Sequence, residues 1–335
     1  MATPAASAHS RNQGVDYLRA ICILYIVGYW HLIPYTTALP GYANWFTEGL
    51  KDAALATFVF CSGYLLGRHA ITLDPRGLWS FYRRRLLRIY PLYLLALILF
   101  GVFGIASQTQ VVEGALLISM FSPPAMPTLW FVTMIMVFYL IAPPLIRFAH
   151  RPALAVLIGG GLLVALVGWH QWIRHLDLRI LLYLPVFVLG ILYRRHAFLG
   201  TLAKRHERIL LGLLILLLPL SVTGNEWSLR GAFLLMPLIL ISAPALFVLS
   251  NRIADRLHGP SIAFLAYSSF GLYLFHRLIF KAAITVFYPA MGWEQVLYLL
   301  MVALPLSLLI GYGLQRGYDG LVSRLSAGRR MRTSA

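Results

Sequence analysis

The chain has 335 residues, of which 60% are hydrophobic and only 12% are charged. Its mean hydropathy is +0.76, above the usual range of a soluble domain of this length, so the composition predicts an integral membrane protein that contacts lipids. The formal net charge of +17 would suit a nucleic-acid-binding protein. However, the basic residues flank apolar segments, as they do in membrane proteins that follow the positive-inside rule. We therefore expect no nucleic-acid partner.

Apolar segments near the ~20 residues needed to cross ~30 Å of hydrocarbon recur along the whole chain. We expect spans at 15–36, 52–70, 86–106, 128–147, 152–170, 179–193, 209–223, 231–249, 261–281 and 295–315. The predicted fold class is all-α, a polytopic membrane helix bundle with about ten transmembrane helices. Three consecutive glycines, Gly159 to Gly161, are expected to let a neighbouring helix approach the fifth span closely.

The distribution of basic residues predicts the orientation of these spans. Most of the 28 lysines and arginines fall on one side of the bundle if the N-terminus is cytoplasmic, so both termini are predicted inside. Residues 1–14 are expected to form a polar cytoplasmic tail, 15–316 the membrane domain and 317–335 a basic cytoplasmic tail. The first 14 residues lack the apolar stretch and cleavage site of a signal peptide, so we expect the first span to be retained.

His31 is the first candidate functional residue. It follows a run of apolar residues in the first span, and an ionisable side chain at that depth usually faces the interior of the bundle or a cavity. A hydrogen bond to a neighbouring helix is the alternative interpretation. Cys22 and Cys61 both lie in apolar segments, which predicts neither a disulfide framework nor a cysteine-rich metal site, and no metal is expected elsewhere.

Several local patterns together resemble those of the membrane-bound acyltransferase-3 family of polysaccharide and glycan O-acyltransferases. The family places Arg and His in its first helix, Phe-x-x-Ser-Gly in the second, and Arg-x-x-Arg before a Pro in the third. The corresponding patterns here are Asp-Tyr-Leu-Arg at 16–19 with His31, Phe-Val-Phe-Cys-Ser-Gly-Tyr-Leu-Leu-Gly at 58–67, Arg-Arg-Arg-Leu-Leu-Arg-Ile-Tyr-Pro-Leu-Tyr at 83–93, Leu-Trp-Phe at 129–131, Tyr-Leu-Ile-Ala-Pro at 139–143 and Ser-Phe-Gly-Leu-Tyr-Leu-Phe-His at 269–276.

This resemblance implies transfer of an acyl group, most commonly acetyl from acetyl-CoA, to a hydroxyl of a surface or lipid-linked glycan in the bacterial cytoplasmic (inner) membrane. The family's essential histidine and arginine map to His31 and Arg19. Family members usually have ten residues between these two, whereas this chain has eleven. At ~100° per residue the extra residue rotates the pair ~120° apart on a continuous helix. A π-bulge in the first helix would restore the alignment.

The donor side is expected at the cytoplasmic end of the bundle. Arg85 and Arg88 lie one helical turn apart, and their guanidinium groups suit bidentate contact with the phosphates of CoA. We expect Arg19 and Ser62 to contact the donor as well. Each has a structural alternative, since arginine runs mark cytoplasmic helix ends and a Ser-Gly pair often serves helix packing.

His31 and His276 are the predicted catalytic residues, both in the outer half of the bundle. A histidine can act as general base on the acceptor hydroxyl, which typically contributes ~10²–10⁴-fold, or can take the acyl group itself. The sequence leaves both possibilities open. We expect His276 to orient the sugar or to stabilise the oxyanion.

Four aromatic residues are expected to line the substrate path. Tyr64, Trp130 and Tyr273 are predicted to bind substrate, and Tyr139 is placed with Trp130 on the acceptor side. Trp130 would equally suit an aromatic anchor at the membrane interface, because it opens a span.

Two other function classes suit the composition. A proton-coupled membrane transporter would use buried His and Arg, but the spans show no paired interruptions, and only Asp16 and Asp52 offer carboxylates near the spans. A non-catalytic scaffold in a glycan-assembly complex would leave His31, Arg85 and Arg88 unexplained. The oligomeric state is not predicted.

Overall fold

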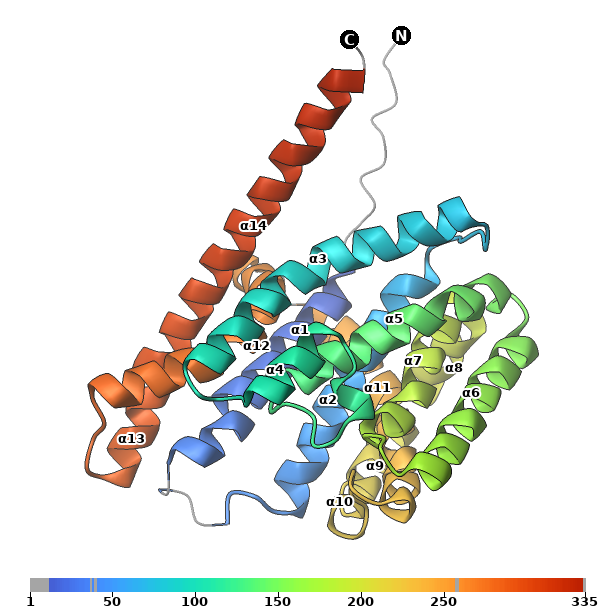
Figure 1. The fold of residues 1–335 in the computed structure, drawn as a ribbon. Helices are drawn as coiled ribbons and strands as arrows, with labels where there is room; N and C mark the ends of the chain where they lie inside the picture. The colour runs from blue at the N-terminus through green and yellow to red at the C-terminus, as the bar shows by residue number, and fades with distance from the viewer. Residues whose placement is uncertain (1–11, 37, 39–40, 257–258, 334–335) are drawn as a thin grey trace.

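A computed structural model describes residues 12–36, 38, 41–256 and 259–333. Over these residues the chain forms helices and connecting segments without strands (Figure 1). The elements are α1 (Gln13–Gly28), η1 (Trp30–Tyr35), α2 (Trp45–Gly67), α3 (Pro75–Val102), α4 (Gln108–Ala115), η2 (Ser119–Phe121), α5 (Trp130–Phe148), α6 (Pro152–Ile173), α7 (Arg179–Arg195), α8 (Ala197–Arg205), α9 (Glu207–Leu217), α10 (Leu220–Thr223), α11 (Leu229–Ala254), α12 (Pro260–Val286), α13 (Gly292–Tyr298), η3 (Leu299–Ala303) and α14 (Leu304–Thr333). The predicted all-α class is confirmed.

Within the described residues, eight helical segments are long and apolar enough to cross a membrane, or nine if the bent pair α7 and α8 counts as one span. They are Gln13–Tyr35, Trp45–Gly67, Pro75–Val102, Trp130–Phe148, Pro152–Ile173, Leu229–Ala254, Pro260–Val286 and Gly292–Arg324. The sequence-based count of about ten is not confirmed. The expected span at 209–223 is divided between α9 and α10 next to Pro219, where the proline ring disfavours a continuous helix.

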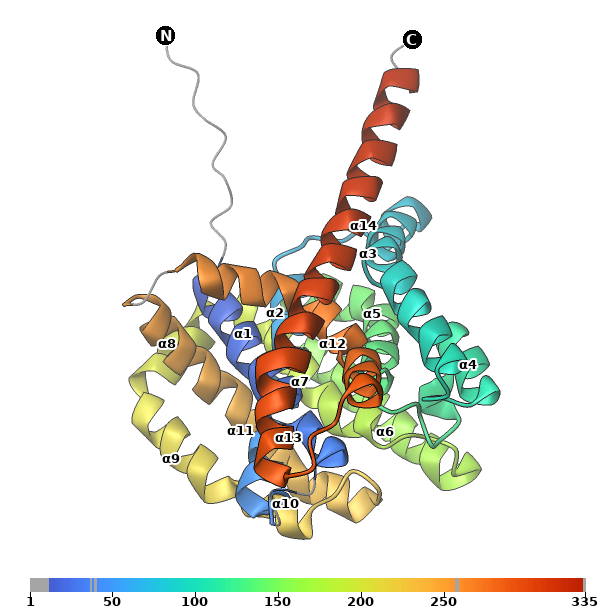
Figure 2. The same ribbon diagram turned by 90° about the vertical axis from the view of Figure 1, so that its left-hand side faces the viewer.

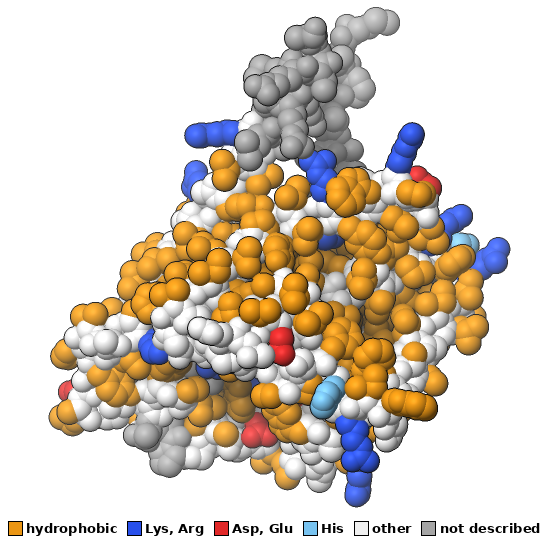
Figure 3. All heavy atoms as spheres, in the orientation of Figure 1, with side chains coloured by type: hydrophobic (Ala, Val, Ile, Leu, Met, Phe, Trp, Pro, Cys, Tyr) orange, Lys and Arg blue, Asp and Glu red, His pale blue; other side chains and the backbone are white. Residues whose placement is uncertain are grey.

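α1 begins and α14 ends at the same end of the molecule, as Figures 1 and 2 both show. α3, α6 and α14 lie at the periphery and present apolar side chains outward. Leu157 is 70% exposed on α6 and Leu309 is 61% exposed on α14. The space-filling view shows apolar side chains across most of the visible face (Figure 3). Such a surface is stable against lipid hydrocarbon rather than water, so the chain is a multi-pass membrane protein.

α2 and α7 pack closely in the centre of the bundle because glycines meet backbone there. A Cβ added at Gly63 would lie 2.2 Å from the Phe187 carbonyl oxygen, and one at Gly190 would lie 2.3 Å from the carbonyl oxygen of Phe60. Small residues at helix crossings allow this approach in membranes.

The expected packing role of the glycines in α6 is only partly correct. A Cβ at Gly159 would lie 3.2 Å from Val188, whereas Gly160 and Gly161 face open space. One of the three glycines therefore serves close packing, and the tight crossing occurs at Gly63 and Gly190 instead.

α3 starts immediately outside the apolar segment with a well-formed N-cap. The Asp74 side chain accepts a hydrogen bond from the Gly77 amide, and Pro75 occupies the first helical turn, which suits a helix start. The hydrogen bonds from Thr72 and Gly77 lower the pKa of the Asp74 carboxyl. This cap determines where α3 begins, and therefore which face of the helix carries Arg85 and Arg88.

Candidate active site

His31 and His276 contact each other directly. His31 Nδ1 lies 2.8 Å from His276 Nε2, and the two rings are nearly parallel with centroids 4.8 Å apart. His276 is 0% exposed, whereas His31 is partly exposed. Of the two residues, His31 is the more exposed.

The alignment of His31 with Arg19 comes from a helix break, not from a π-bulge. α1 is α-helical from Gln13 to Gly28. Tyr29 then leaves the helical region at φ −128° and ψ −68°, and His31 lies in the 3-10 helix η1, which contains Pro34. The first helix therefore contains no π-bulge between Gln13 and Gly28, and the change of helix type alters the register instead.

The consequence is that both residues reach α12. Arg19 Nη2 donates to Ser269 Oγ at 2.9 Å, while His31 meets His276. Ser269 and His276 are seven residues apart, which places them on the same face of a helix. A continuous helix through residue 31 would have turned Arg19 and His31 roughly 120° apart.

The hydrogen bonds around the pair define the proton positions when both rings are neutral. His276 Nδ1 lies 2.9 Å from the Tyr273 carbonyl oxygen and 3.2 Å from that of Leu272. Carbonyl oxygens only accept, so Nδ1 of His276 carries its proton and Nε2 is an acceptor. His31 Nδ1 must then donate to His276, which leaves the lone pair on His31 Nε2.

A pocket of about 1130 Å³ opens at the end of the bundle where α1 begins and α2 ends. Seven arginines and two aspartates are among its lining residues, which is a strongly basic balance. They are Arg19, Arg68, Arg83, Arg84, Arg85, Arg88 and Arg194, with Asp16 and Asp319. We call this the arginine pocket.

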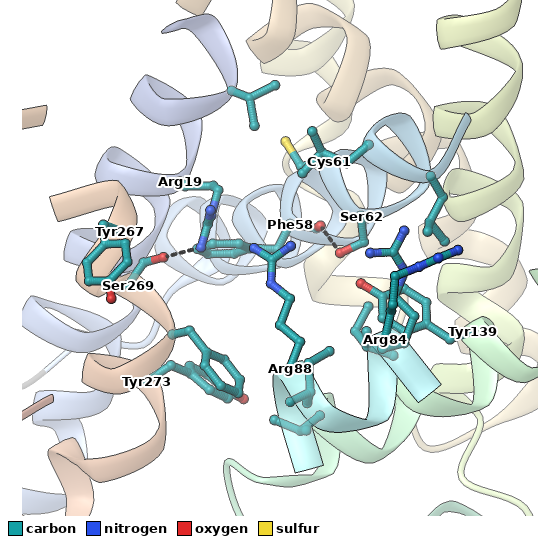
Figure 4. Close-up of a pocket in the computed structure, with 18 of the residues that line it drawn as sticks. Arg19, Phe58, Cys61, Ser62, Arg84, Arg88, Tyr139, Tyr267, Ser269 and Tyr273 are labelled. Carbon is teal, nitrogen blue, oxygen red and sulfur yellow. Dashed lines mark hydrogen bonds between the residues drawn. The ribbon is translucent and has the colours of Figure 1, made fainter. Parts of the chain in front are cut away.

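Arg85, Arg88 and Ser62, which are predicted to bind the donor, all line the arginine pocket. The guanidinium of Arg85 lies 6.0 Å from the centre of the Tyr139 ring, and its Nε is buried without a hydrogen-bond partner among the described residues. Tyr139 had been expected on the acceptor side and instead lies beside Arg85. Ser62 Oγ donates to the Phe58 carbonyl at 3.1 Å, as the dashed line in Figure 4 shows.

Tyr64 and Arg19 also line the arginine pocket. The Tyr64 hydroxyl accepts hydrogen bonds from Asn12 Nδ2 at 3.2 Å and from Arg194 Nη1 at 3.3 Å. Arg19 and Arg88 both point into the pocket in Figure 4. Tyr64, which is predicted to bind substrate, therefore lies in the same pocket as Arg19 and Arg88.

The arginine pocket ends one helical turn from the histidine pair. Its lining includes Ile26 of α1 and Tyr273 of α12 but not His31 or His276. The ring centroids of Tyr273 and His276 are 6.1 Å apart. The structure thus places the pair just beyond the inner end of the pocket.

Trp130 lies outside the arginine pocket. Its ring stacks on Tyr183 at 6.4 Å and lies under the Arg179 guanidinium, 3.9 Å from the ring centre. Trp130 is only 8% exposed, so it is a buried contact at the start of α5 and not an exposed interfacial anchor.

His69, between α2 and α3, reports the electrostatic character of the pocket. Burial, followed by the guanidinium groups of Arg85 and Arg68, lowers the pKa of His69 below its usual 6.5. His69 also lines the pocket. Burial disfavours a charge of either sign, but the positive charge of the guanidinium groups favours an anionic ligand.

Sequence analysis did not single out Arg68, Arg194 or Asn12 as site residues. Both arginines had been attributed to the positive-inside rule, which explains basic residues at helix ends but does not separate those that turn inward. Asn12 lies before the first span and has no chemical pattern around it. Only the arrangement of α1, α2 and α7 brings the three together.

No group of three or more His, Cys, Asp or Glu side chains in the described part of the chain is arranged to hold a metal ion. Asp177, which is close in sequence to His170 and His175, receives two hydrogen bonds from the Arg179 guanidinium.

Comparison with known proteins agrees with the motifs. A family model described as Acyltransferase domain, of the acyltransferase-3 type, matches residues 12–314 and so covers most of the chain. No curated protein and no solved structure gives a significant match.

Proposed function

Because this chain belongs to the acyltransferase-3 family, we propose that it transfers an acyl group, most commonly acetyl, from acyl-CoA to a hydroxyl of a surface or lipid-linked glycan. The observation that carries the proposal is the His31–His276 pair lying just beyond the inner end of a pocket lined by seven arginines. A polyanionic donor suits the arginines, and a hydroxyl acceptor suits a neutral imidazole.

The donor is acyl-CoA in this proposal. Its nucleotide carries several phosphates, which guanidinium groups bind through paired, charge-assisted hydrogen bonds. Arg85 has an unpartnered buried Nε, and Arg88 lies one turn further along α3. The pantetheine arm would then extend along Ser62 toward Tyr273.

The arrangement implies a cytoplasmic position for the arginine pocket, since acyl-CoA is made there and the positive-inside rule favours the same side. We therefore assign the protein to the bacterial cytoplasmic membrane, with the pocket facing inward.

The proposed chemistry uses His31 as general base. Nε2 of His31 takes the proton of the acceptor hydroxyl while the hydroxyl oxygen forms a bond to the thioester carbonyl carbon. Collapse of the tetrahedral species breaks the carbon–sulfur bond, and the proton on His31 passes to the CoA thiolate. His276 acts as a positioning residue, because its hydrogen bonds to backbone keep Nδ1 of His31 protonated and Nε2 available.

Transfer to His31 itself is the other route that the geometry allows, since the same Nε2 lone pair is the nucleophile. The two routes differ in one observable. Direct transfer releases CoA only with an acceptor present, whereas a covalent route releases one equivalent of CoA and labels the protein without an acceptor.

Activity is best tested with purified protein in lipid nanodiscs, labelled acetyl-CoA and a membrane extract that contains glycan acceptors. We expect His31→Ala to reduce transfer by at least ~10²-fold, the lower end of general-base contributions. His150→Ala is the control, because His150 is exposed and lies outside the arginine pocket. Full transfer by His31→Ala would contradict the assignment.

Arg88→Ala tests the donor site. We expect a higher KM for acetyl-CoA with little change in kcat, since the phosphates bind equally in the ground and transition states. Arg76→Ala is the matched control, because Arg76 is exposed on the same helix and does not line the pocket. An equal effect of both variants would argue for general electrostatics rather than a site.

A further inference from the structure

A second group of polar side chains lies at the end of the bundle opposite to the arginine pocket. Arg179 opens α7, whereas Arg194, near the end of the same helix, lines the arginine pocket. Fifteen residues at ~1.5 Å each separate the two by about 22 Å. Asp52 lies in the first third of α2, and Arg68 of the pocket follows the end of that helix.

We define the distal cluster as Asp52, Arg179, Tyr183 and Glu226 with Thr128, Trp130 and Trp227. Its centre is Arg179, which is 5% exposed. The Arg179 Nε donates to Asp177 at 2.8 Å, and Nη1 lies 3.7 Å from Glu226. Buried charges in a membrane protein are costly and typically mark substrate paths.

Aromatic faces surround this guanidinium. The Arg179 guanidinium lies 3.9 Å from the centre of the Trp130 ring and 5.3 Å from that of Trp227. Trp130 is buried, but Trp227 is 70% exposed. The cluster is therefore a buried polar group with an exposed indole at its edge, where a ligand can arrive.

Two hydroxyl groups in the distal cluster lack partners. Tyr183 OH and Thr128 Oγ1 are fully buried and make no hydrogen bond with any described residue. Tyr183 is 0% and Thr128 3% exposed. Native structures leave few buried polar atoms unsatisfied, and those that remain call for a ligand, water or ion.

The cluster is close to the histidine pair. The Tyr273 hydroxyl donates to the carbonyl of Thr128, and Tyr273 precedes His276 by one turn. Tyr183 stacks on the Trp130 ring, and the Arg179 guanidinium lies against the same ring. The same tyrosine, Tyr273, thus borders the arginine pocket on one side and the distal cluster on the other.

The arginine pocket and the distal cluster differ in their balance of positive and negative side chains. The arginine pocket has seven arginines against two aspartates. At the distal end Arg179 is paired with Asp177 and Glu226, and Asp52 is paired with Lys51 at 3.0 Å. Carboxylates, hydroxyls and aromatic faces without excess positive charge suit a neutral ligand rich in hydroxyl groups.

We propose that the distal cluster is the acceptor site and that it binds a neutral sugar, with Tyr183 and Thr128 hydrogen-bonded to sugar hydroxyls and Trp227 contacting its apolar face. This inference rests on the proposed function, in which a hydroxyl acceptor meets the acyl group beside His31. It adds the location of the acceptor and its lack of charge.

Isothermal titration of the protein in nanodiscs with a panel of neutral methyl hexosides, and with the matching anionic methyl hexuronides, tests the site without any donor. We expect a neutral hexoside to bind more tightly than its hexuronide. Tyr183→Phe should weaken that binding about tenfold through loss of a buried hydrogen bond, and the Kd for acetyl-CoA should not change. Tyr193→Phe removes a hydroxyl from the same helix outside both sites and should leave sugar binding unchanged.

The results separate this inference from the proposed function. Sugar binding that depends on Tyr183, in a protein that transfers no acyl group, would support the site and overturn the transfer. Transfer with an acceptor KM that is the same in Tyr183→Phe and wild type would support the function and overturn the site. Tighter binding of the hexuronide, or no Tyr183-dependent binding of any hexoside, would also overturn it.

Discussion

His276 determines the chemistry of His31 through one hydrogen bond. Removal of the acceptor at position 276 should release the His31 ring and let its Nδ1 lose the proton. We expect His276→Ala to lower kcat by more than tenfold with little change in the KM for acetyl-CoA, and His276→Gln to recover part of the loss because its amide oxygen can accept from His31 Nδ1. Steady-state kinetics of both variants provide the measurement, and equal activities would contradict a positioning role.

His69 should couple donor binding to pH. Burial and the nearby guanidiniums of Arg68, Arg84, Arg85 and Arg195 lower its pKa, and bound phosphates would add negative charge and raise that pKa. Binding would then take up a proton, so affinity for CoA should increase as the pH falls through the pKa of His69 in the complex. Titrations across pH 5 to 8 would detect the slope.

His69→Ala tests whether His69 causes the pH dependence of CoA binding. The variant should bind CoA with a flatter pH dependence over the same range. A slope identical to that of wild type would assign the proton to another group, such as the phosphates of the ligand.

Among the helices, the crossing of α2 and α7 determines the position of the distal cluster relative to the arginine pocket. α2 carries Asp52 and Ser62, and α7 carries Arg179 and Arg194. Gly63→Ala places a Cβ 2.2 Å from the Phe187 carbonyl, and backbone cannot move aside as a side chain can. We expect a loss of about 1–3 kcal/mol in stability, seen as a lower Tm.

Gly160→Ala is the matched control for this crossing. A Cβ at Gly160 meets nothing within 4 Å, and alanine favours helix over glycine by roughly 1 kcal/mol. Its Tm should be unchanged or higher. If Gly63→Ala behaved in the same way, the close approach of α2 and α7 would not limit stability.

Element boundaries show where sequence patterns suffice. The apolar segments identified eight of the helices, because length and hydropathy alone define them. The break after Gly28 could not be predicted from the first span, since residues 21–33 are almost uniformly apolar and offer no periodic signal. A π-bulge would have kept the first span helical through His31. The α-helix instead ends at Gly28, and a 3-10 helix that contains Pro34 follows it.

At the scale of the molecule, the arginine pocket and the distal cluster lie at opposite ends, so they should face opposite sides of the membrane. Arg76, at the start of α3, and Trp172, near the end of α6, are exposed. We expect Arg76→Cys and Trp172→Cys to be labelled by a membrane-impermeant thiol reagent from opposite sides of sealed vesicles, with Arg76→Cys reacting from the cytoplasmic side. The native Cys22 and Cys61 are buried, but Cys61 lines the arginine pocket, so both variants are made in a Cys61→Ser background. Labelling of both from one side would overturn the two-sided arrangement.

Apolar length and short motifs are local properties, and they predict a helical membrane protein and its family without knowledge of the fold. The sequence also identifies His31, His276, Arg85 and Arg88 as the residues to follow. The contacts between helices pair the two histidines and gather arginines from α1, α2, α3 and α7 into one pocket. They also leave Tyr183 and Thr128 without hydrogen-bond partners among the described residues. These features depend on contacts between helices far apart in sequence. Because the helices are apolar on almost all sides, the periodicity of hydropathy does not indicate which helix faces pack together.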